Sequence, residues 1–304
     1  MINTEIAALR AIIGARPKPN DVAEMRQNID ARGLANPIAA DVAVETLDIG
    51  GIKAEWTHTP NADPQRAILY VHGGGYVIGS LDSHRHAYAE MGRAAEVKVL
   101  ALDYRLAPEH PFPAPIEDTL AGYRHLLALG FKPGRIAIAG DSAGGGLVVA
   151  ALVAIRDAGL PQPSCGWAIS PWVDMEAIGA SMITKADEDP TVQKAGIGFM
   201  AQTYLNGADP RHPLAAPLYA DLTGIAPLLI QVGAAETLLD DSIRLAGVAG
   251  AAQVPVTLEI WPEMIHVWHV YHPHLAAGRR AIVRGGAYIR DVMDGNPPVD
   301  TRAG

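Results

Sequence analysis

The stretch that decides the fold is RIAIAGDSAGGGLVVAALVA, residues 135–154. Residues 135–139 form a short run rich in Ile and Ala that predicts a strand, and residues 143–158 have a helical pattern. Ser142 lies at the junction, with Gly140 two residues before it and Gly144 two residues after it. Larger side chains at those two positions would collide with the neighbouring strand or helix, and the start of the helix directs N–H groups and positive dipole toward the serine. This context predicts a nucleophilic serine on a sharp turn.

The segments on either side of this turn alternate between short apolar runs and helical patterns. Eight strands are expected, at residues 42–49, 52–57, 67–71, 97–102, 135–139, 166–169, 227–232 and 256–260. Helices are expected at residues 3–15, 21–33, 82–95, 115–129, 143–158, 192–205, 239–252 and 274–293. Continuous apolar strands that alternate with helices indicate a mostly parallel sheet covered on both faces, and the hairpin around Gly50 and Gly51 predicts an antiparallel edge. The predicted fold class is therefore α/β.

The remaining segments predict a division of the chain. Residues 1–40 are expected to form N-terminal cap helices, and residues 41–294 the main domain. The gap between strands 166–169 and 227–232 is too long for one crossover, so about residues 174–215 are expected to be an insertion that completes a small helical cap over the strand ends. Residues 295–304 are expected to form a flexible tail.

A second signal, His72-Gly73-Gly74-Gly75-Tyr76, follows the strand expected at residues 67–71. Consecutive glycines let backbone N–H groups point inward together, and such a loop forms an oxyanion hole with the N–H of the residue after the nucleophile, here Ala143. The competing interpretation is a phosphate-binding loop, but the chain has no Gly-Lys-Ser/Thr and lacks the dinucleotide spacing. His72 is expected to anchor this loop and not to carry a proton.

A serine nucleophile needs a base, and this topology places the acid and then the histidine after the serine in the chain. His266, in the loop after the strand at residues 256–260, fits that order. Three further histidines follow it, His269, His272 and His274. They raise a metal site as an alternative, but no HExxH sequence is present and carboxylates nearby are few. Neither a metal nor another cofactor is expected.

The acid is expected in the loop after the strand at residues 227–232, where three carboxylates occur. Glu236 is nearest the strand end and is the expected triad acid. Asp240 is the second choice, because Asp240 and Asp241 are placed where they would begin the next helix.

Composition narrows the function classes. The chain has 24 Lys and Arg against 33 Asp and Glu, a formal net charge of −9, and no cluster of positive charge. A nucleic-acid groove and an acidic-membrane patch both need such a cluster, so neither partner is expected. No apolar run is long enough to span a membrane. Cys165 is the only cysteine, which excludes a disulfide within the chain, and no signal-peptide pattern opens the sequence, so a cytoplasmic location is expected.

Three motifs together resemble the hormone-sensitive-lipase-like family of bacterial esterases. They are HGGG at residues 72–75, DYRLAPE at 103–109 followed by PFPA at 111–114, and GDSAGG at 140–145. The resemblance covers about residues 40–293 and implies an α/β-hydrolase fold with a helical cap, and cofactor-free hydrolysis of esters with short acyl chains. It implies that Ser142 is the nucleophile, that His266 is the general base, and that the backbone of Gly73, Gly74 and Ala143 forms the oxyanion hole, a role that Gly75 is expected to share.

The chain departs from this family at the acid. Many members have Asp-Pro-Leu where this chain has Glu236-Thr237-Leu238, so the acid would be a glutamate, which such triads accept. Four residues of the second motif are expected to be a buried scaffold for the oxyanion loop, Asp103, Tyr104, Arg105 and Glu109. Asp141 is expected to have a similar structural role beside the nucleophile.

The sequence thus predicts a serine carboxylester hydrolase that acts on small, short-acyl esters through an acyl-enzyme. A lactone hydrolase with the same triad fits these residues as well, and a non-catalytic receptor on the same fold is the alternative from another class, which the presence of His266 disfavours. Residues expected to line the substrate pocket are Tyr76, Trp172, Phe199, Met200 and Tyr204. The last strand is expected to be a sheet edge, through which a homodimer would form.

Overall fold

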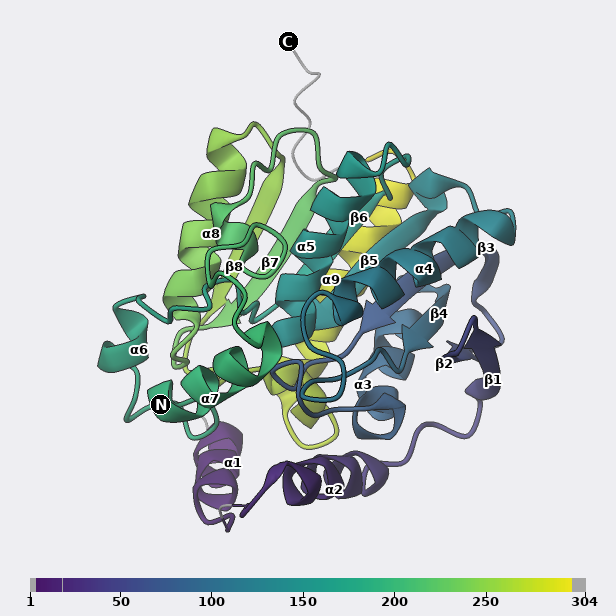
Figure 1. The fold of residues 1–304 in the computed structure, drawn as a ribbon. Coiled ribbons are helices and arrows are strands. Elements are labelled where there is room, and N and C mark those ends of the chain that lie inside the picture. Colours follow the sequence, from purple (N-terminus) through teal and green to yellow (C-terminus); the bar gives the residue numbers. More distant parts are fainter. Residues whose placement is uncertain (1–3, 18, 297–304) are drawn as a thin grey trace.

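The structure is a computed structural model that describes residues 4–17 and 19–296. Its centre is a sheet of eight strands (Figure 1). The strands are β1 (Ala43–Ile49), β2 (Ile52–His58), β3 (Asp63–Val71), β4 (Val97–Leu102), β5 (Ile136–Asp141), β6 (Cys165–Ile169), β7 (Leu228–Gly233) and β8 (Val256–Trp261). Their order across the sheet is β1-β2-β4-β3-β5-β6-β7-β8. Strands β3 to β8 all run parallel to one another. The hairpin β1–β2 forms the antiparallel edge beside β4.

Helices cover both faces of this sheet. The longer ones are α3 (Leu81–Ala95), α4 (Ala114–Ala128), α5 (Ala143–Asp157), α8 (Leu239–Ala251) and α9 (Ala276–Met293). Figure 1 shows α4, α5 and α8 in front of the sheet and α9 behind it, and α3 packs against α9. The α/β-hydrolase architecture predicted from the sequence, with eight mostly parallel strands and helices on both faces, is therefore confirmed.

The core has one part on each face because side chains alternate along every strand. On β3, Leu69 and Val71 face the layer that contains α4, α5 and α8. Ile68 and Tyr70 face the layer that contains α3 and α9. Since both faces are covered, β5 is buried along its whole length, as its continuously apolar sequence predicts.

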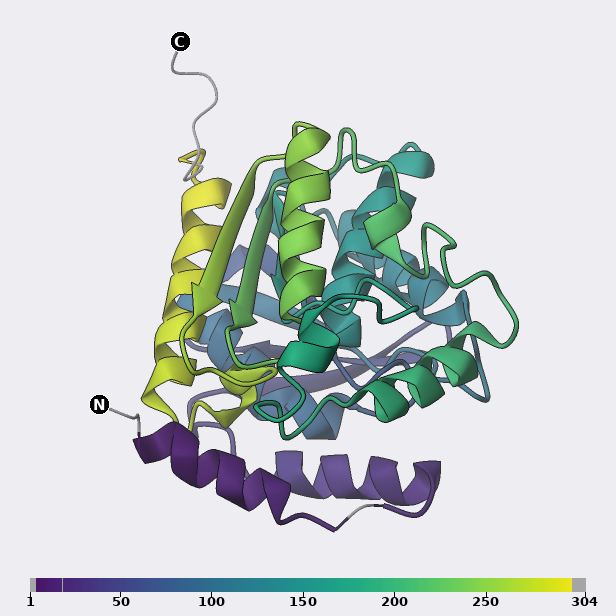
Figure 2. The ribbon, with the colours of Figure 1, turned by 90° about the vertical axis from the view of Figure 1, so that its left-hand side faces the viewer.

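Four further helices lie at the carboxyl end of the strands. They are α1 (Thr4–Gly14), α2 (Val22–Leu34), α6 (Ser181–Thr184) and α7 (Lys194–Leu205). In Figure 2 the arrowheads of β7 and β8 point toward the end of the molecule where α1 and α2 lie. Ile6 and Ile13 of α1 pack with Ile265 and Trp268 from the loop after β8. The N-terminal segment therefore supports the loop that carries His266.

Several element boundaries differ from the expectation by one or more residues, and two of these differences have a clear structural reason. Strand β3 begins at Asp63 and not at residue 67, because Asp63 pairs with Val97 of β4 before a bulge shifts the register. Helix α9 begins at Ala276 and not at residue 274, because a short helical turn, η3 (Trp268–Tyr271), and Pro273 precede it. The tail expected at residues 295–304 lies outside the described residues from 297 onward.

Candidate active site

Ser142 lies on the turn between β5 and α5, and its backbone has a left-handed (positive φ) conformation. Its φ is 55° and its ψ is −120°, a strained combination for a residue with a side chain. A Cβ on Gly140 would lie 2.5 Å from the carbonyl oxygen of Val71, and one on Gly144 would lie 2.1 Å from the same atom. The two glycines are therefore required by the adjacent strand, and they let the turn present the serine at the carboxyl end of the sheet.

The structure brings Ser142, His266 and Glu236 together. Oγ of Ser142 lies 2.9 Å from Nε2 of His266, and Nδ1 of His266 lies 2.7 Å from Oε2 of Glu236. Since the carboxylate can only accept at this position, Nδ1 carries the proton and Nε2 is free to accept the serine proton. Both His266 and Glu236 are buried. The geometry is that of a nucleophile, a base and an orienting acid.

Ser170, which sequence reasoning missed, joins the acid to the histidine loop. Its hydroxyl donates to Oε1 of Glu236 at 2.9 Å and accepts from the N–H of Val267 at 3.2 Å. The N–H of Gly233 donates to the same carboxylate oxygen. Ser170 directly follows β6 at the carboxyl end of the sheet, and that position is the one sequence signal that could have identified it.

The charges in this group shift the titration of the histidine. Burial alone would lower the pKa of His266, but the hydrogen bond to Glu236 and its negative charge outweigh burial and raise the pKa above the usual 6.5. Burial raises the pKa of Glu236, and the hydrogen bonds from His266 and Gly233 oppose that rise. The pair therefore favours a protonated imidazole, the form that develops when the serine gives up its proton.

The glycine loop lies beside the serine, and its N–H groups are not equivalent. The N–H of Gly73 donates to Oδ1 of Asp141 at 3.1 Å, so it is not available to a substrate. Among the described residues, the N–H groups of Gly74 and Gly75 have no protein acceptor. Ala143 opens α5, so its N–H has no acceptor within the helix. The expectation for Gly73 is thus corrected, and Gly74, Gly75 and Ala143 are left as the candidate donors.

Buried polar side chains hold this loop in place. Asp141 also accepts from the hydroxyl of Tyr70, and Nε2 of His84 lies 3.5 Å from its other oxygen. Although burial opposes the shift, the charge and hydrogen bond of His84 and the hydroxyl of Tyr70 lower the pKa of Asp141 to about 2. His72 stacks on Tyr104, whose hydroxyl donates to the carbonyl oxygen of His72 at 2.7 Å.

The environment of His72 fits an anchor. Burial lowers the pKa of His72 to about 3, so the ring is neutral. Two of the four residues expected to form a buried scaffold for the glycine loop have other surroundings. Arg105 pairs with Asp118, and Glu109 is exposed and pairs with Arg26, so neither is the buried support that was expected.

The alternative acids have other partners. Oδ2 of Asp240 accepts from the N–H of Ser181 at 2.9 Å. Oδ2 of Asp241 accepts from the N–H groups of Val173 and Asp174, and burial raises the pKa of Asp241 to about 7. Neither carboxylate bonds to His266, so the structure brings only Glu236 to the imidazole.

A cavity of about 440 Å³ lies over Ser142. Its floor contains Ser142, His266 and the glycine loop, and its walls come from the segment around α2, from α7 and from the loop after β8. The apolar wall residues are Pro17, Pro19, Met25, Ile29, Ile78, Trp172, Val192, Ile197, Met200, Val267 and Val270. A pocket of this size and character accommodates a small, mostly apolar substrate.

The residues expected to bind substrate fall into two groups. Met200 and Trp172 line the cavity. Tyr76 and Tyr204 do not, because their rings stack on each other at 3.9 Å between centroids in the buried core. Phe199 is 43% exposed and does not line the cavity either, since it projects from another side of α7. The sequence pattern alone did not show which side of α7 faces the serine.

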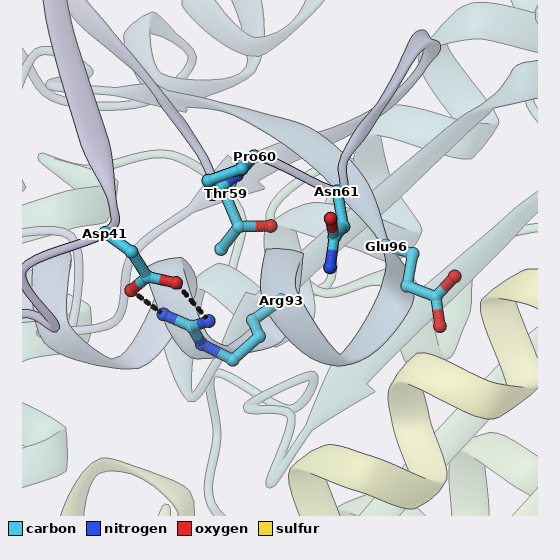
Figure 3. A pocket seen from close by; sticks show the side chains of 6 residues that line it. All are labelled: Asp41, Thr59, Pro60, Asn61, Arg93 and Glu96. Atoms are coloured by element: carbon cyan, nitrogen blue, oxygen red, sulfur yellow. Dashed lines mark hydrogen bonds and ion pairs between the residues drawn. The ribbon is translucent and has the colours of Figure 1, made fainter.

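Other features of the described residues lie apart from this site. A hollow of about 600 Å³, shown in Figure 3, shares no residue with the cavity over Ser142. It is lined by Asp41, Thr59, Pro60, Asn61, Arg93 and Glu96. Within residues 4–17 and 19–296, no three His, Cys, Asp or Glu side chains are arranged to hold a metal ion. None of the helices described there is long and apolar enough to cross a membrane.

Comparison with known proteins identifies close relatives. Residues 68–270 match the family described as the alpha/beta hydrolase fold. The chain is 52% identical over 246 residues to an acetyl-hydrolase of Streptomyces hygroscopicus, covering 81% of this chain and 82% of that protein. It is 30% identical over 242 residues to an esterase of Acinetobacter venetianus, covering 79% and 80% of the two chains.

Solved structures are similar over almost the whole chain. The crystal structure of an esterase from the bacterial hormone-sensitive lipase family is 48% identical, with a TM-score of 0.94 over 96% of this chain and 99% of that one. The esterase EstE5, crystallised and soaked with p-nitrophenyl butyrate, is 49% identical, with a TM-score of 0.93 over the same shares, 96% and 99%.

Proposed function

Because the chain belongs to the α/β-hydrolase family, among esterases of the hormone-sensitive lipase type, and is a carboxylesterase, we propose that it hydrolyses small, short-acyl esters through an acyl-enzyme. The catalytic triad in this proposal is Ser142, His266 and Glu236. The observation that carries it is the unbroken series of contacts from Oγ of Ser142 to the carboxylate of Glu236, at 2.9 and 2.7 Å.

In the first half of the reaction, Oγ of Ser142 attacks the ester carbonyl while Nε2 of His266 takes the hydroxyl proton. Negative charge then develops on the carbonyl oxygen, next to the N–H groups proposed as the oxyanion hole, those of Gly74, Gly75 and Ala143. The imidazolium is stabilised by Glu236, and it returns the proton to the leaving alkoxide, so that an alcohol departs and Ser142 remains acylated.

In the second half, water replaces the alcohol. His266 takes a proton from the water as the resulting hydroxide attacks the acyl carbonyl, and it then returns that proton to Oγ of Ser142 as the acid departs. In this proposal the protein supplies every group that the two half-reactions need, and neither half-reaction uses a cofactor.

The cavity supports the substrate size in the proposal. Its volume of about 440 Å³ and its apolar walls fit a short acyl chain and a small alcohol. The relatives support the ester class by their names, acetyl-hydrolase and esterase, and one similar crystal was soaked with a butyrate ester.

The test is hydrolysis of p-nitrophenyl esters from acetate to laurate, beside five- to seven-membered lactones, with Ser142→Ala as the blank. We expect activity that is highest on short acyl chains and absent from the blank. An alanine variant with full activity would refute the mechanism. Turnover of lactones far above that of any acyclic ester would change the substrate class, and inactivity on both would favour a binding protein.

Several expectations go with this proposal and stay predictions. They are the division into cap helices at residues 1–40, a main domain with an insertion at about 174–215, a cytoplasmic location, and a homodimer formed through β8, which lies at the edge of the sheet.

A further inference from the structure

A buried carboxylate outside the triad lies behind the catalytic acid. Asp189 belongs to the segment between α6 and α7 and is only 2% exposed. Its Oδ2 accepts from the N–H of Thr237 at 2.9 Å and lies 3.3 Å from the hydroxyl of Thr237. Because Thr237 directly follows Glu236, this carboxylate fixes the backbone next to the triad acid.

The other oxygen of Asp189 holds a wall of the cavity. Oδ1 accepts from the N–H of Thr191 at 2.8 Å, from its hydroxyl at 2.6 Å, and from the N–H of Val192 at 3.0 Å. The side-chain amide of Gln193 donates to the backbone oxygen of Asp189 at 2.7 Å. Thr191, Val192 and Gln193 all line the cavity over Ser142. The side chain of Asp189 therefore joins the wall of the cavity to the loop between β7 and α8 that carries Glu236, here called the acid loop.

Hydrogen-bond donors surround the carboxylate of Asp189. Its oxygens accept from the N–H and hydroxyl groups of Thr191 and Thr237 and from the N–H of Val192. None of the ion pairs formed by the described residues includes Asp189. The side chain is thus held by neutral dipoles alone, and a carboxylate in such a buried setting acts strongly on ionisable groups nearby.

The catalytic histidine is one of those groups. Three carboxylates, Glu236, Asp189 and Asp141, act on His266, and each of them favours the imidazolium. Glu236 does so by direct contact at 2.7 Å, whereas Asp189 acts across the acid loop.

We propose that Asp189 is a positioning residue for catalysis, which holds Glu236 and the cavity wall in one fixed arrangement and supplies a second negative charge behind the His266–Glu236 pair. This inference rests on the proposed triad. The two bonds to Asp189 depend on Thr237. A proline at residue 237, as in the Asp-Pro-Leu pattern of many members of the family, would have neither the N–H nor the hydroxyl.

The experiment compares Asp189→Asn, Thr237→Val and the double variant, with rates on p-nitrophenyl butyrate divided by active sites counted with a fluorophosphonate probe. We expect Asp189→Asn to lower kcat by about tenfold to a hundredfold, since displacement of a catalytic group by a fraction of an ångström has effects of this order. We expect the acid limb of its pH profile to move to lower pH, because one of the charges that favour the imidazolium is gone. Thr237→Val, which keeps the N–H, should lose less activity.

The double variant tests whether the two side chains act as one link. Its loss of kcat should be smaller than the product of the two single losses. The matched control is Asp118→Asn, which removes a buried carboxylate on α4 that accepts from the N–H of Arg105 at 2.8 Å. Asp118 does not line the cavity, so its variant should keep the native kcat per site and the native pH limb.

Three results would overturn the proposal. The first is an Asp189→Asn enzyme with native kcat per site. The second is one whose kcat per site falls while the acid limb stays in place, which shows that Asp189 supplies no charge to the His266–Glu236 pair. The third applies if Asp189→Asn does not fold, in which case a Thr237→Val enzyme with native kcat decides against the link. Inactivity of the unmodified protein on every ester would instead refute the proposed function, which separates the two failures.

Discussion

The backbone N–H of Gly73 donates to Oδ1 of Asp141 at 3.1 Å, so the residue before Ser142 holds the start of the glycine loop. Asp141 thereby links the serine turn to the donors proposed for the oxyanion hole. A Cβ on Gly73 would lie 2.3 Å from the same carboxylate, which shows how closely the two segments approach.

The first prediction concerns this link. Asp141→Ala should lower kcat by about a hundredfold because the loop loses its anchor and the donors shift from the reacting carbonyl. It should also destabilise the fold by about 1–3 kcal/mol, since a buried N–H is left unpaired. Asp141→Asn retains an acceptor and should keep more activity. Steady-state kinetics and thermal unfolding measure both effects, and equal kcat in all three proteins would contradict the prediction.

The identity of the acid can be decided by a pair of isosteric variants. Glu236→Gln should lower kcat by about 10⁴-fold, because the amide cannot stabilise the imidazolium and favours the wrong tautomer. Asp240→Asn should keep a kcat close to native, since Asp240 bonds to the N–H of Ser181 and not to His266. The prediction fails if the larger loss occurs in Asp240→Asn.

The activity should fall on the acid side at a pH above 6.5. Glu236 raises the pKa of His266 above that value, and only the neutral imidazole can accept the serine proton, so kcat/KM should decline as the pH falls through the raised pKa. A pH profile of kcat/KM on a neutral ester measures the limb. A limb below pH 6.5 would show that burial, which lowers the pKa, outweighs the carboxylate.

Ser170 should matter for turnover although it does not touch the substrate. Ser170→Ala removes the hydroxyl that donates to Glu236 and accepts from Val267, so kcat should fall by about tenfold as the acid and the histidine loop lose their common partner. The matched control is Ser242→Ala, because Ser242 is equally buried and its hydroxyl has no partner among the described residues. Similar kcat values for the two variants would contradict this role.

The depth of the cavity should depend on Met200. Met200→Ala removes a side chain that lines the cavity and lies next to Gly75, so kcat/KM for octanoate and decanoate esters should rise relative to acetate by about tenfold. Phe199→Ala, on the adjacent residue that points away from the cavity, should leave the ratio unchanged. A changed ratio in Phe199→Ala alone would show that the wall has been assigned to the wrong residue.

The local sequence was sufficient for the architecture. Strand and helix patterns alternate with their own periodicity, so eight strands, the antiparallel edge and the covering helices could all be predicted from short windows of residues. The glycines at residues 140 and 144 could be interpreted in the same way, because the steric demand of a strand-to-helix turn is local.

Many other contacts between distant residues were beyond that reasoning. Ser170 lies 66 residues from Glu236 and 97 from Val267, and its position after β6 does not show which residues it bonds to. Gly73 and Asp141 are 68 residues apart, so the sequence could not show that one of the loop's N–H groups is already in use. Tyr76 and Tyr204 were expected at the cavity, but they stack on each other in the core.

The sequence by itself therefore determined the fold class, the serine on its turn and the glycine loop, because each depends on backbone geometry within a few residues. Only the tertiary structure decided which carboxylate reaches His266, which N–H groups remain free, which side of α7 faces the cavity, and that Asp189 lies behind the acid. Each of these features depends on contacts between segments that are distant in the sequence. Such segments meet only when the packed sheet brings the carboxyl ends of its strands together.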